Sequence, residues 1–465
     1  MTYDTIIQGG TIHAASHSYV GDIAISGEKI AAVSGPGTLK PTGGTKTINA
    51  KGKEVIPGCI DVHVHLELPF MGSVSCDDFD SGSKAAASGC ITTVIDFAAP
   101  GKGESLKQAH ETWMAKAEGK SLVDYSWHMC IVDDQHLKEI PQLIKMGLPT
   151  FKEFMIYASM GWQSDDARLF ESLELMHKHD GMLLVHAESS RVLDLLIERN
   201  HTQSKMRKYG ARLHTMTRPN YVEAEAIERA IRWCEVTGGT LYIVHMSTGE
   251  GADLVKTAQA RGVNVWSETC THYLVLDDSV FAEKDGHLYA CQPQVKKDAD
   301  IRRLWRALDE GDEISVVSTD TCSFTRKQKA MWKGDWTKIP MGLPGLDTMV
   351  PIMYTHGVRA GRISMNRLVE LCSTNPAKIM GMGGRKGQIA PGYDADIAII
   401  DPHRTVKIDH RKLQSRCDWS PYQGQQLGGF AHTTLVRGTV IVENHKVIGA
   451  NGHGKFIKRQ APGSL

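Results

Sequence analysis

Two histidines at the end of a mostly apolar run are the first residues in this chain whose types and spacing indicate chemistry. The run covers residues 57–62 and leads directly into His63, and one residue separates His63 from His65. Side chains alternate between the two faces of a β-strand, so both imidazoles are expected to point the same way. Paired imidazoles at a strand end can begin a metal site, and the alternative is a pair of ordinary strand histidines.

Four further residues of this kind lie in or at the end of later apolar runs. They are Lys152, His186, His245 and Asp320. A histidine satisfied within the core would explain any one of them. Six such residues are hard to explain by packing alone if their strands share one sheet, because the ends of parallel strands then meet at one edge.

Short apolar segments alternate with helical patterns through the middle of the chain. The eight candidate strands cover residues 59–65, 90–97, 125–131, 150–155, 182–186, 241–245, 263–267 and 314–319. Helical patterns cover residues 79–88, 105–118, 137–146, 167–179, 221–236, 251–260 and 301–308, with two more at 351–361 and 367–372. This alternation predicts an α/β fold, a (β/α)8 TIM-like barrel, whose active site lies at the C-terminal ends of the strands.

Both ends of the chain are rich in β-strand patterns joined by glycine turns. Neither end has enough strands to close a core alone, so we expect them to form one small β-sandwich together. The predicted division is residues 1–55 and 386–445 for the β-sandwich, 56–385 for the metal-binding barrel, and 446–465 for a flexible or contact-making C-terminal tail.

The composition argues against several classes of partner. The 465 residues include 53 Lys plus Arg and 53 Asp plus Glu, so no basic field favours nucleic acid or a membrane surface. The N-terminus lacks the pattern of a signal peptide, and no apolar stretch is long enough to span a bilayer. The ten cysteines are scattered without a CxxC pair, which favours reduced thiols in the cytoplasm.

Lys152 needs a separate explanation, because an ammonium group repels metal cations. Phe151 and Phe154 flank it, and burial among apolar groups favours the neutral amine. A neutral amine can react with carbon dioxide to give an anionic carbamate that can bridge two metals. The alternative is a lysine that pairs with a carboxylate or extends to solvent.

The whole chain resembles the cyclic amidohydrolases of the dihydropyrimidinase and hydantoinase branch. The resemblance rests on Val55-Ile-Pro-Gly-Cys-Ile-Asp-Val-His-Val-His65, Leu68-Pro-Phe-Met71, Asp77-Asp-Phe79, Phe151-Lys152 with Tyr157, Val185-His-Ala-Glu188, Val244-His-Met-Ser-Thr248, Thr319-Asp320 and Pro391-Gly-Tyr-Asp-Ala-Asp396.

This resemblance implies a cofactor of two divalent metal ions, for which we expect zinc. One metal would be held by His63, His65 and Asp320, and the other by His186 and His245. Carboxylated Lys152 (N6-carboxylysine) would bridge the pair. The resemblance also implies the small β-sandwich and a homotetramer.

The expected reaction is hydrolysis of the cyclic amide of dihydropyrimidines or 5-substituted hydantoins to N-carbamoyl amino acids. A metal-bridging hydroxide would attack the ring carbonyl, with Asp320 as general base and then general acid. Tyr157 resembles the family tyrosine that hydrogen-bonds the developing oxyanion, and its alternative role is an aromatic residue in a loop wall.

Several residues depart from the family pattern or bear on the substrate. Thr321 stands where the family has histidine, and Gln292 and Met341 stand where it has serine and asparagine in the substrate site. No arginine of the acid-binding relatives follows His65, and Leu68 and Phe70 suit a hydrophobic substituent or simple packing. The alternatives are an amidohydrolase for another cyclic amide, such as allantoin, and a non-catalytic dihydropyrimidinase-like assembly protein.

Overall fold

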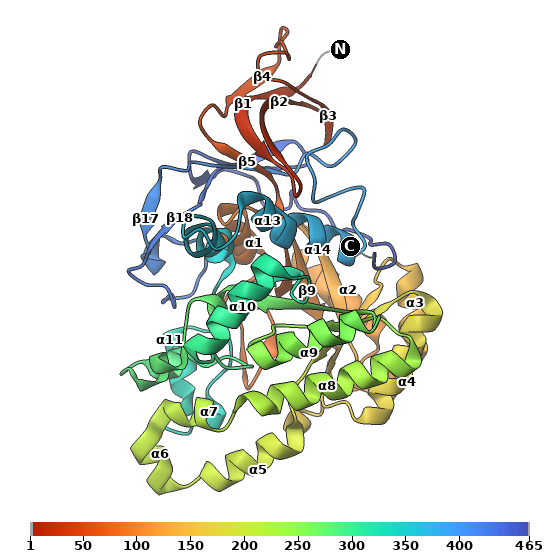
Figure 1. Ribbon diagram of the computed structural model, residues 1–465, viewed down its shortest axis with the longest axis vertical. Coiled ribbons are helices and arrows are strands. Elements are labelled where there is room, and N and C mark those ends of the chain that lie inside the picture. The colour runs from red at the N-terminus through yellow and green to blue at the C-terminus, as the bar shows by residue number, and fades with distance from the viewer. Residues whose placement is uncertain (1–2, 464–465) are drawn as a thin grey trace.

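The centre of the molecule is a barrel of eight parallel strands. A computed structural model describes residues 3–463, with the strand order β15-β14-β13-β12-β11-β10-β9-β6 (Figure 1). The barrel closes beside β6, where the backbone N–H of His65 donates to the carbonyl of Thr321 at 2.8 Å. All eight predicted strands are confirmed, as β6 (Cys59–Val64), β9 (Ile91–Ala98), β10 (Asp124–Cys130), β11 (Thr150–Phe154), β12 (Met182–His186), β13 (Leu241–Ile243), β14 (Val265–Cys270) and β15 (Val316–Ser318).

Helices cover the outside of the barrel where the sequence predicts them. They are α1 (Phe79–Ser88), α2 (Leu106–Ala117), α3 (Ile140–Lys145), α4 (Asp166–His179), α8 (Asn220–Thr237), α9 (Gly249–Ala260) and α10 (Asp298–Glu310). Helix α1 begins at Asp78, whose side chain accepts from the backbone N–H of Ser81, so the start of this helix is fixed by its own sequence. The two later helical patterns appear as α12 (Met349–Ile352) and α13 (Met365–Val369), each continued by a wider helical turn.

Three helices between β12 and β13 were not predicted. They are α5 (Ser190–Asn200), α6 (Gln203–Tyr209) and α7 (Leu213–Met216), and α5 and α6 form the lower end of the molecule in Figure 1. Only Ser190 and Leu193 of α5 are buried. Val192 and Leu195 of α5 are exposed instead, so its apolar residues do not form the single core-facing stripe that predicts a helix from sequence.

Strands from both chain ends form a second sheet. Its order is β21-β20-β19-β16-β5-β1-β2-β3, with β4 paired to β1. Strand β5 lies antiparallel to β16, which places Pro57 opposite Ile397. This separate sheet fits the predicted β-sandwich. The strands are β1 (Thr5–His13), β2 (Ser18–Ser26), β3 (Lys29–Ser34), β4 (Lys46–Asn49), β5 (Glu54–Pro57), β16 (Ile397–Ile400), β19 (Ala431–Val436), β20 (Thr439–Glu443) and β21 (Lys446–Val447).

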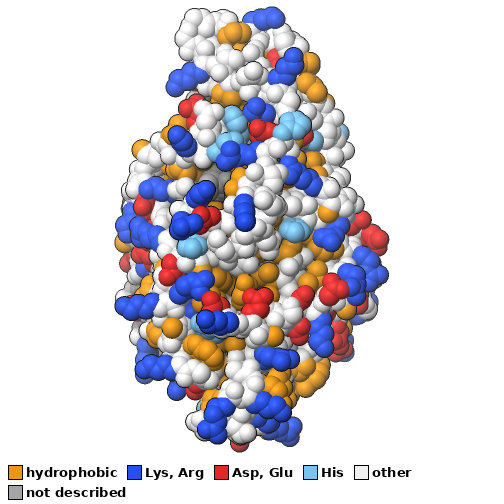
Figure 2. Space-filling view, turned by 90° about the vertical axis from the view of Figure 1, so that its left-hand side faces the viewer, with side chains coloured by type: hydrophobic (Ala, Val, Ile, Leu, Met, Phe, Trp, Pro, Cys, Tyr) orange, Lys and Arg blue, Asp and Glu red, His pale blue; other side chains and the backbone are white. Residues whose placement is uncertain are grey.

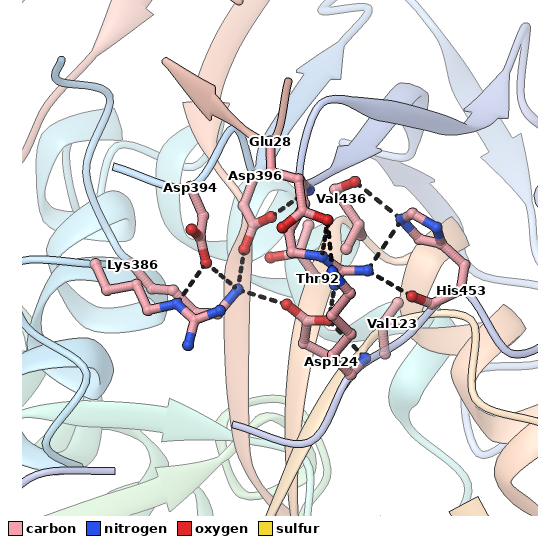
Figure 3. A network of polar contacts seen from close by, with 12 residues as sticks. Glu28, Thr92, Val123, Asp124, Lys386, Asp394, Asp396, Val436 and His453 are labelled. Carbon is pink, nitrogen blue, oxygen red and sulfur yellow. Dashed lines mark hydrogen bonds and ion pairs between the residues drawn. The ribbon is translucent and has the colours of Figure 1, made fainter. Parts of the chain in front are cut away.

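A buried cluster of charges joins the barrel to the second sheet (Figure 3). The Nζ of Lys386 lies 2.8 Å from Asp124, at the start of β10, and 3.3 Å from Asp394, and it also contacts Asp396. Arg437 contacts Asp124 from the other side. Since the ammonium group of Lys386 lies among the three carboxylates, each buried charge has an opposite charge beside it.

The C-terminal segment packs against the barrel. The backbone N–H of Tyr125 donates to Lys455 at 3.0 Å, and that of Ile457 donates to Tyr125 at 2.7 Å. Ile457 and Arg459 are buried, and Nε of Arg459 donates to Ser126 at 2.9 Å. The segment was expected to be either flexible or contact-making, and these contacts complete the N-terminal end of the barrel.

The surface carries charges of both signs. Figure 2 shows Lys and Arg interspersed with Asp and Glu over the face it presents, in keeping with their equal numbers in the chain. Within residues 3–463, no helix has both the length and the apolar character that crossing a membrane would require.

Candidate metal centre

One pocket collects every candidate site residue that the sequence pointed to. It opens at the C-terminal end of the barrel strands, where the first, fourth, fifth, sixth and eighth strands each contribute a side chain. The predicted residues on its wall are His63, His65, Leu68, Phe70, Lys152, Tyr157, His186, His245, Gln292, Asp320 and Met341. Residues far apart in the chain therefore meet around one cavity.

The first group consists of His63, His65 and Asp320. The Nε2 atoms of both histidines lie 3.2 Å from the same carboxylate oxygen of Asp320, and their ring centroids are 5.1 Å apart. The potential ligand atoms of the three side chains lie within 4.8 Å of one another. Two imidazoles and a carboxylate at these separations can hold one divalent metal ion.

The second group is the pair His186 and His245. Their ring centroids lie 4.5 Å apart, and the ring of His245 is 5.3 Å from that of His63. The two groups are therefore neighbours within one pocket, which is the arrangement that a pair of metal ions requires.

Irregular backbone geometry positions His63, His245 and Asp320 in the pocket. Strand β6 shifts register against β9 between Asp61 and Val64, and both Val62 and His63 pack inside the barrel near Phe97. His245 and Asp320 have φ values of 41° and 48°, in the left-handed region that such residues rarely adopt. This strain turns both side chains into the pocket and is typical of functional sites.

Lys152 lies near two aromatic rings that also line the pocket. Its Nζ is 5.3 Å from the ring centroid of Phe97 and 5.2 Å from that of Phe154. Among the residues that the structure describes, this Nζ has no hydrogen-bond partner. Burial lowers the pKa of Lys152 to about 8, a shift that the nearby carboxylates of Glu268 and Asp320 oppose.

Burial favours the neutral form of His63, His186 and His245. Burial lowers the pKa of His63 and His245 well below its ordinary value, and it also lowers the pKa of His186. A neutral imidazole keeps a free lone pair on one nitrogen, as metal binding requires.

Two buried carboxylates orient these rings, and no sequence motif had indicated a role for either. Nδ1 of His63 contacts Glu268, and Nε2 of His186 lies 2.8 Å from Glu188. A ring whose one nitrogen is held by a carboxylate presents the other to a metal. The sequence signal for Glu268 was missed because the seventh strand was predicted to end at Ser267, whereas β14 continues to Cys270.

Tyr157 follows β11 and forms part of the pocket wall. Its backbone has a φ of 72°, and its ring centroid lies 5.3 Å from that of His186 and 5.6 Å from that of Phe70. Burial, with the nearby charge of Glu188, raises the pKa of Tyr157 well above its ordinary value. Its hydroxyl therefore stays protonated and able to donate a hydrogen bond.

Thr321 is the one departure from the family pattern that lies outside this pocket. Its side chain is buried behind Asp320, and its backbone N–H donates to Thr319 Oγ1 at 3.1 Å. By contrast, Gln292 and Met341 line the pocket, as do the apolar side chains of Leu68 and Phe70. Gln292 and Met341 therefore belong to the wall of the candidate site, and the backbone carbonyl of Thr321 takes part in the barrel closure.

The described residues contain a second group of possible metal ligands, but its surroundings differ from those of the pocket. Asp124, Asp394 and Asp396 also bring their oxygens within 4.8 Å of one another, but the ammonium group of Lys386 lies among them. That cluster is satisfied by an ion pair, whereas Nζ of Lys152 and Nδ1 of His245 in the pocket have no partner among the described residues.

Comparisons with known proteins find relatives that match nearly the whole chain. Residues 55–441 match the model of the amidohydrolase family. The chain is 38% identical to a D-hydantoinase of Geobacillus stearothermophilus over 99% of its own length and 97% of that protein, and 36% identical to a D-hydantoinase of Streptomyces coelicolor over 99% and 98%. Its structure is similar to that of a dihydropyrimidinase from Brevibacillus agri, with a TM-score of 0.95, 35% identity and coverage of 99% and 100%.

Proposed function

The chain belongs to the amidohydrolase family, and we propose that it hydrolyses the ring amide of 5-substituted hydantoins and dihydropyrimidines to N-carbamoyl amino acids. It is a hydrolase of cyclic amides. The observation that carries the proposal is the meeting of four histidines, one lysine and one aspartate at the C-terminal mouth of the barrel.

The donor atoms of the pocket fit two divalent metal ions, with zinc as the expected metal. His63, His65 and Asp320 would hold one ion, and His186 and His245 the other. Nδ1 of His245 and Nζ of Lys152 are buried without partners among the described residues, so the site is polar but unsatisfied by the protein alone. When bound, such ions polarise a carbonyl group and lower the pKa of water towards about 7.

Lys152 would bridge the two ions after carboxylation. Its neutral amine adds to carbon dioxide, forming a carbon–nitrogen bond and releasing one proton, and the product is an N6-carboxylysine with one negative charge. The support is the position of Nζ near the rings of Phe97 and Phe154, where no carboxylate forms an ion pair with it among the described residues. A carbamate would supply the anionic oxygens that this otherwise histidine-rich pocket needs.

Asp320 would transfer the proton in the reaction. Its carboxylate accepts a proton from the attacking water and returns it to the ring nitrogen as the carbon–nitrogen bond breaks. The side chain lies beside both His63 and His65, and its left-handed backbone directs it into the pocket. One carboxylate can therefore reach both the nucleophile and the leaving group.

Tyr157 would stabilise the oxyanion that forms on the ring carbonyl. Its hydroxyl remains protonated, and the loop after β11 holds the ring next to His186. A donor fixed in advance costs no reorganisation when charge develops. The ring of the substrate would lie against the pocket wall at Gln292 and Met341, and its substituent against Leu68 and Phe70.

We also propose a homotetramer in the cytoplasm. Support for subunit contacts comes from exposed apolar side chains on and beside the three helices that extend from the barrel: Val192, Leu195, Met216 and Tyr221. Sedimentation of the purified protein at several concentrations would test the assembly, and a stable monomer would contradict it.

A substrate panel tests the proposed reaction. Metal-loaded protein would be assayed with dihydrouracil, dihydrothymine, 5-methylhydantoin, 5-benzylhydantoin, allantoin and dihydroorotate, and the ring-opened products would be measured by chromatography. We expect turnover of the hydantoins and dihydropyrimidines. Hydrolysis of allantoin alone would show that the enzyme acts on a different cyclic amide. If the protein neither hydrolysed any substrate nor bound metal, a non-catalytic role would be favoured.

A further inference from the structure

Lys329 is a fully buried lysine to which the proposed reaction gives no role. It is the last residue of the short helix α11 (Arg326–Lys329), and none of its surface is exposed. Burial lowers the pKa of Lys329 to about 7, and the groups that oppose this shift are the thiols of Cys291, Cys322 and Cys417 rather than a carboxylate. Burying a polar group is costly unless a hydrogen bond compensates it, so the partner of this side chain needs an explanation.

The side chain of Lys329 joins two segments of the catalytic pocket. Its Nζ donates to the carbonyl oxygen of Ala290 at 2.7 Å, and the backbone N–H of Gly342 donates to the same oxygen at 2.9 Å. Ala290 lies two residues before Gln292, and Gly342 directly follows Met341. Gln292, Met341 and Gly342 all line the pocket. One carbonyl group, held by Lys329, therefore fixes the spacing of the two segments.

The backbone groups of these segments are used unevenly. The carbonyl of Ala290 accepts two hydrogen bonds, and that of Cys291 accepts one from Nε2 of His214 at 2.8 Å. By contrast, the backbone groups of Gln292 and Met341 form no hydrogen bond within residues 3–463. Two pocket residues thus keep peptide groups free for a ligand that both donates and accepts hydrogen bonds.

Helix α11 is held in place by a second contact. Nε2 of Gln328 donates to the hydroxyl oxygen of Ser73 at 2.8 Å and to the carbonyl of Val74 at 2.7 Å. These two residues form β8 (Ser73–Val74), which pairs with β7 (Pro69–Phe70). The lysine therefore extends from a helix whose position does not depend on the lysine's own hydrogen bond.

We propose that Lys329 is a positioning residue for substrate binding, which holds the free backbone groups of Gln292 and Met341 at the separation that a cyclic amide ring requires. The inference rests on the proposed hydrolysis of cyclic amides. Lys329 does not line the pocket, so it acts through the carbonyl of Ala290 rather than by touching the ring. Without this hydrogen bond the two segments are less ordered in the free enzyme, and ordering them then opposes binding.

The first test compares Lys329→Met with Lys327→Met in metal-loaded full-length protein. Methionine is close to lysine in length but has no donor, and Lys327 is an exposed lysine of the same helix. We expect Lys329→Met to raise KM for dihydrouracil and 5-methylhydantoin by about tenfold, with kcat within about threefold of wild type and metal content unchanged. Lys327→Met should match the wild type in all three measurements.

A small hydroxamate, which chelates metal ions but has no ring, is the control ligand. Its inhibition constant should be the same in Lys329→Met and wild type, because it binds the metal ions and not the free backbone groups. A general disturbance of the site would weaken binding of the hydroxamate and of the cyclic amides equally, and that result would overturn the inference. Lys329→Gln keeps an N–H donor on a shorter side chain and should recover part of the lost affinity.

Two further outcomes would overturn the inference alone. One is an unchanged KM in folded Lys329→Met protein. The other is failure of both Lys329→Met and Lys329→Gln to fold, which would show that Lys329 serves the stability of the fold. Failure of the wild type to hydrolyse either substrate would instead overturn the proposed function.

Discussion

The carboxylate of Glu268 contacts Nδ1 of His63, and this contact joins the seventh strand of the barrel to the first across 205 residues of sequence. The same carboxylate accepts a hydrogen bond from the hydroxyl of Tyr242 at 3.0 Å and another from the backbone N–H of His245 at 3.2 Å. One buried side chain therefore orients a residue of each proposed metal site. Burial raises the pKa of Glu268 to about 8, although the hydrogen bonds from His245 and Tyr242 and the charge of Lys152 oppose the shift.

Glu268→Gln should weaken metal binding without unfolding the protein. The amide keeps the size of the side chain but loses the carboxylate that fixes His63, and loss of such an orienting group lowers metal affinity by about 10–100-fold. Competition with a coloured chelator measures the affinity. Tyr242→Phe, which removes one contact of Glu268 and leaves His63 in place, should have a smaller effect, and equal affinities in all three proteins would contradict the role of Glu268.

Asp320→Asn should separate metal binding from turnover. The amide can still offer an oxygen to a metal ion, but it cannot accept and return the proton, so kcat should fall by about 10²–10⁴-fold. Metal content measured by atomic emission on the same sample is expected to remain close to that of the wild type. A near-normal kcat in this variant would show that Asp320 does not transfer the proton.

Lys152→Ala should lose metal and activity together, because the bridging carbamate cannot form. A small carboxylic acid such as acetate fits the space vacated by the side chain and should restore part of both. The same acetate concentration added to wild-type protein is the control and should produce no gain. Full metal content in Lys152→Ala without any added acid would argue against a carbamate bridge.

Glu153 should make the free energy of unfolding depend on pH. It follows Lys152 in β11 but faces outward, where its carboxyl group contacts Ser172 of α4, and burial raises its pKa from 4.5 to about 7. The folded protein then holds this proton more tightly than the unfolded chain, so this group lowers the free energy of unfolding as pH rises from about 4.5 to about 7.

Glu153→Gln removes that titration. Its stability relative to wild type should therefore improve between pH 5 and pH 8, by up to about 3 kcal/mol. Urea unfolding at the two pH values measures the difference. A stability difference between variant and wild type that is the same at both values would show that Glu153 ionises normally in the folded protein.

Lys386→Met should destabilise the junction between the barrel and the second sheet. It would leave Asp124, Asp394 and Asp396 buried without the cation that lies among them, at a cost of about 3–5 kcal/mol in the free energy of unfolding. Lys29→Met is the matched control, because Lys29 pairs with Asp394 from a half-exposed position and its loss should cost at most about 1 kcal/mol. Similar costs for both variants would refute a special role for Lys386.

Much of the fold and site could be predicted because the barrel repeats a simple pattern. Apolar strands alternate with amphipathic helices, so the eight strands and most helices follow from periodicity, and the strand ends then bring His63, Lys152 and Asp320 together. Helix α5 could not be predicted in this way, because it turns little of its surface to the core.

The residues that orient the metal ligands could not be predicted from the sequence pattern, for a different reason. Glu268 acts through a contact with a strand at the other end of the barrel sequence, and nothing local in the chain indicates that partner. The turn of His245 into the pocket depends on a left-handed backbone, which a strict alternation of side chains does not predict. The buried positions of Ile457 and Arg459 in the C-terminal segment were likewise hidden, because glycines and polar residues surround them in the sequence.

The pairing of β5 with β16 has a consequence for how the protein is made. During synthesis, strands β1 to β5 leave the ribosome before the barrel, and their partner β16 emerges only after the barrel is complete. Strand β5 therefore keeps an unpaired edge until β16 is made. Pairing of β5 with β16 closes a loop that contains the whole barrel, and closing so long a loop is slow. We expect nascent chains that end before residue 397 to depend on chaperones, and the last part of the chain to complete the folding of the first.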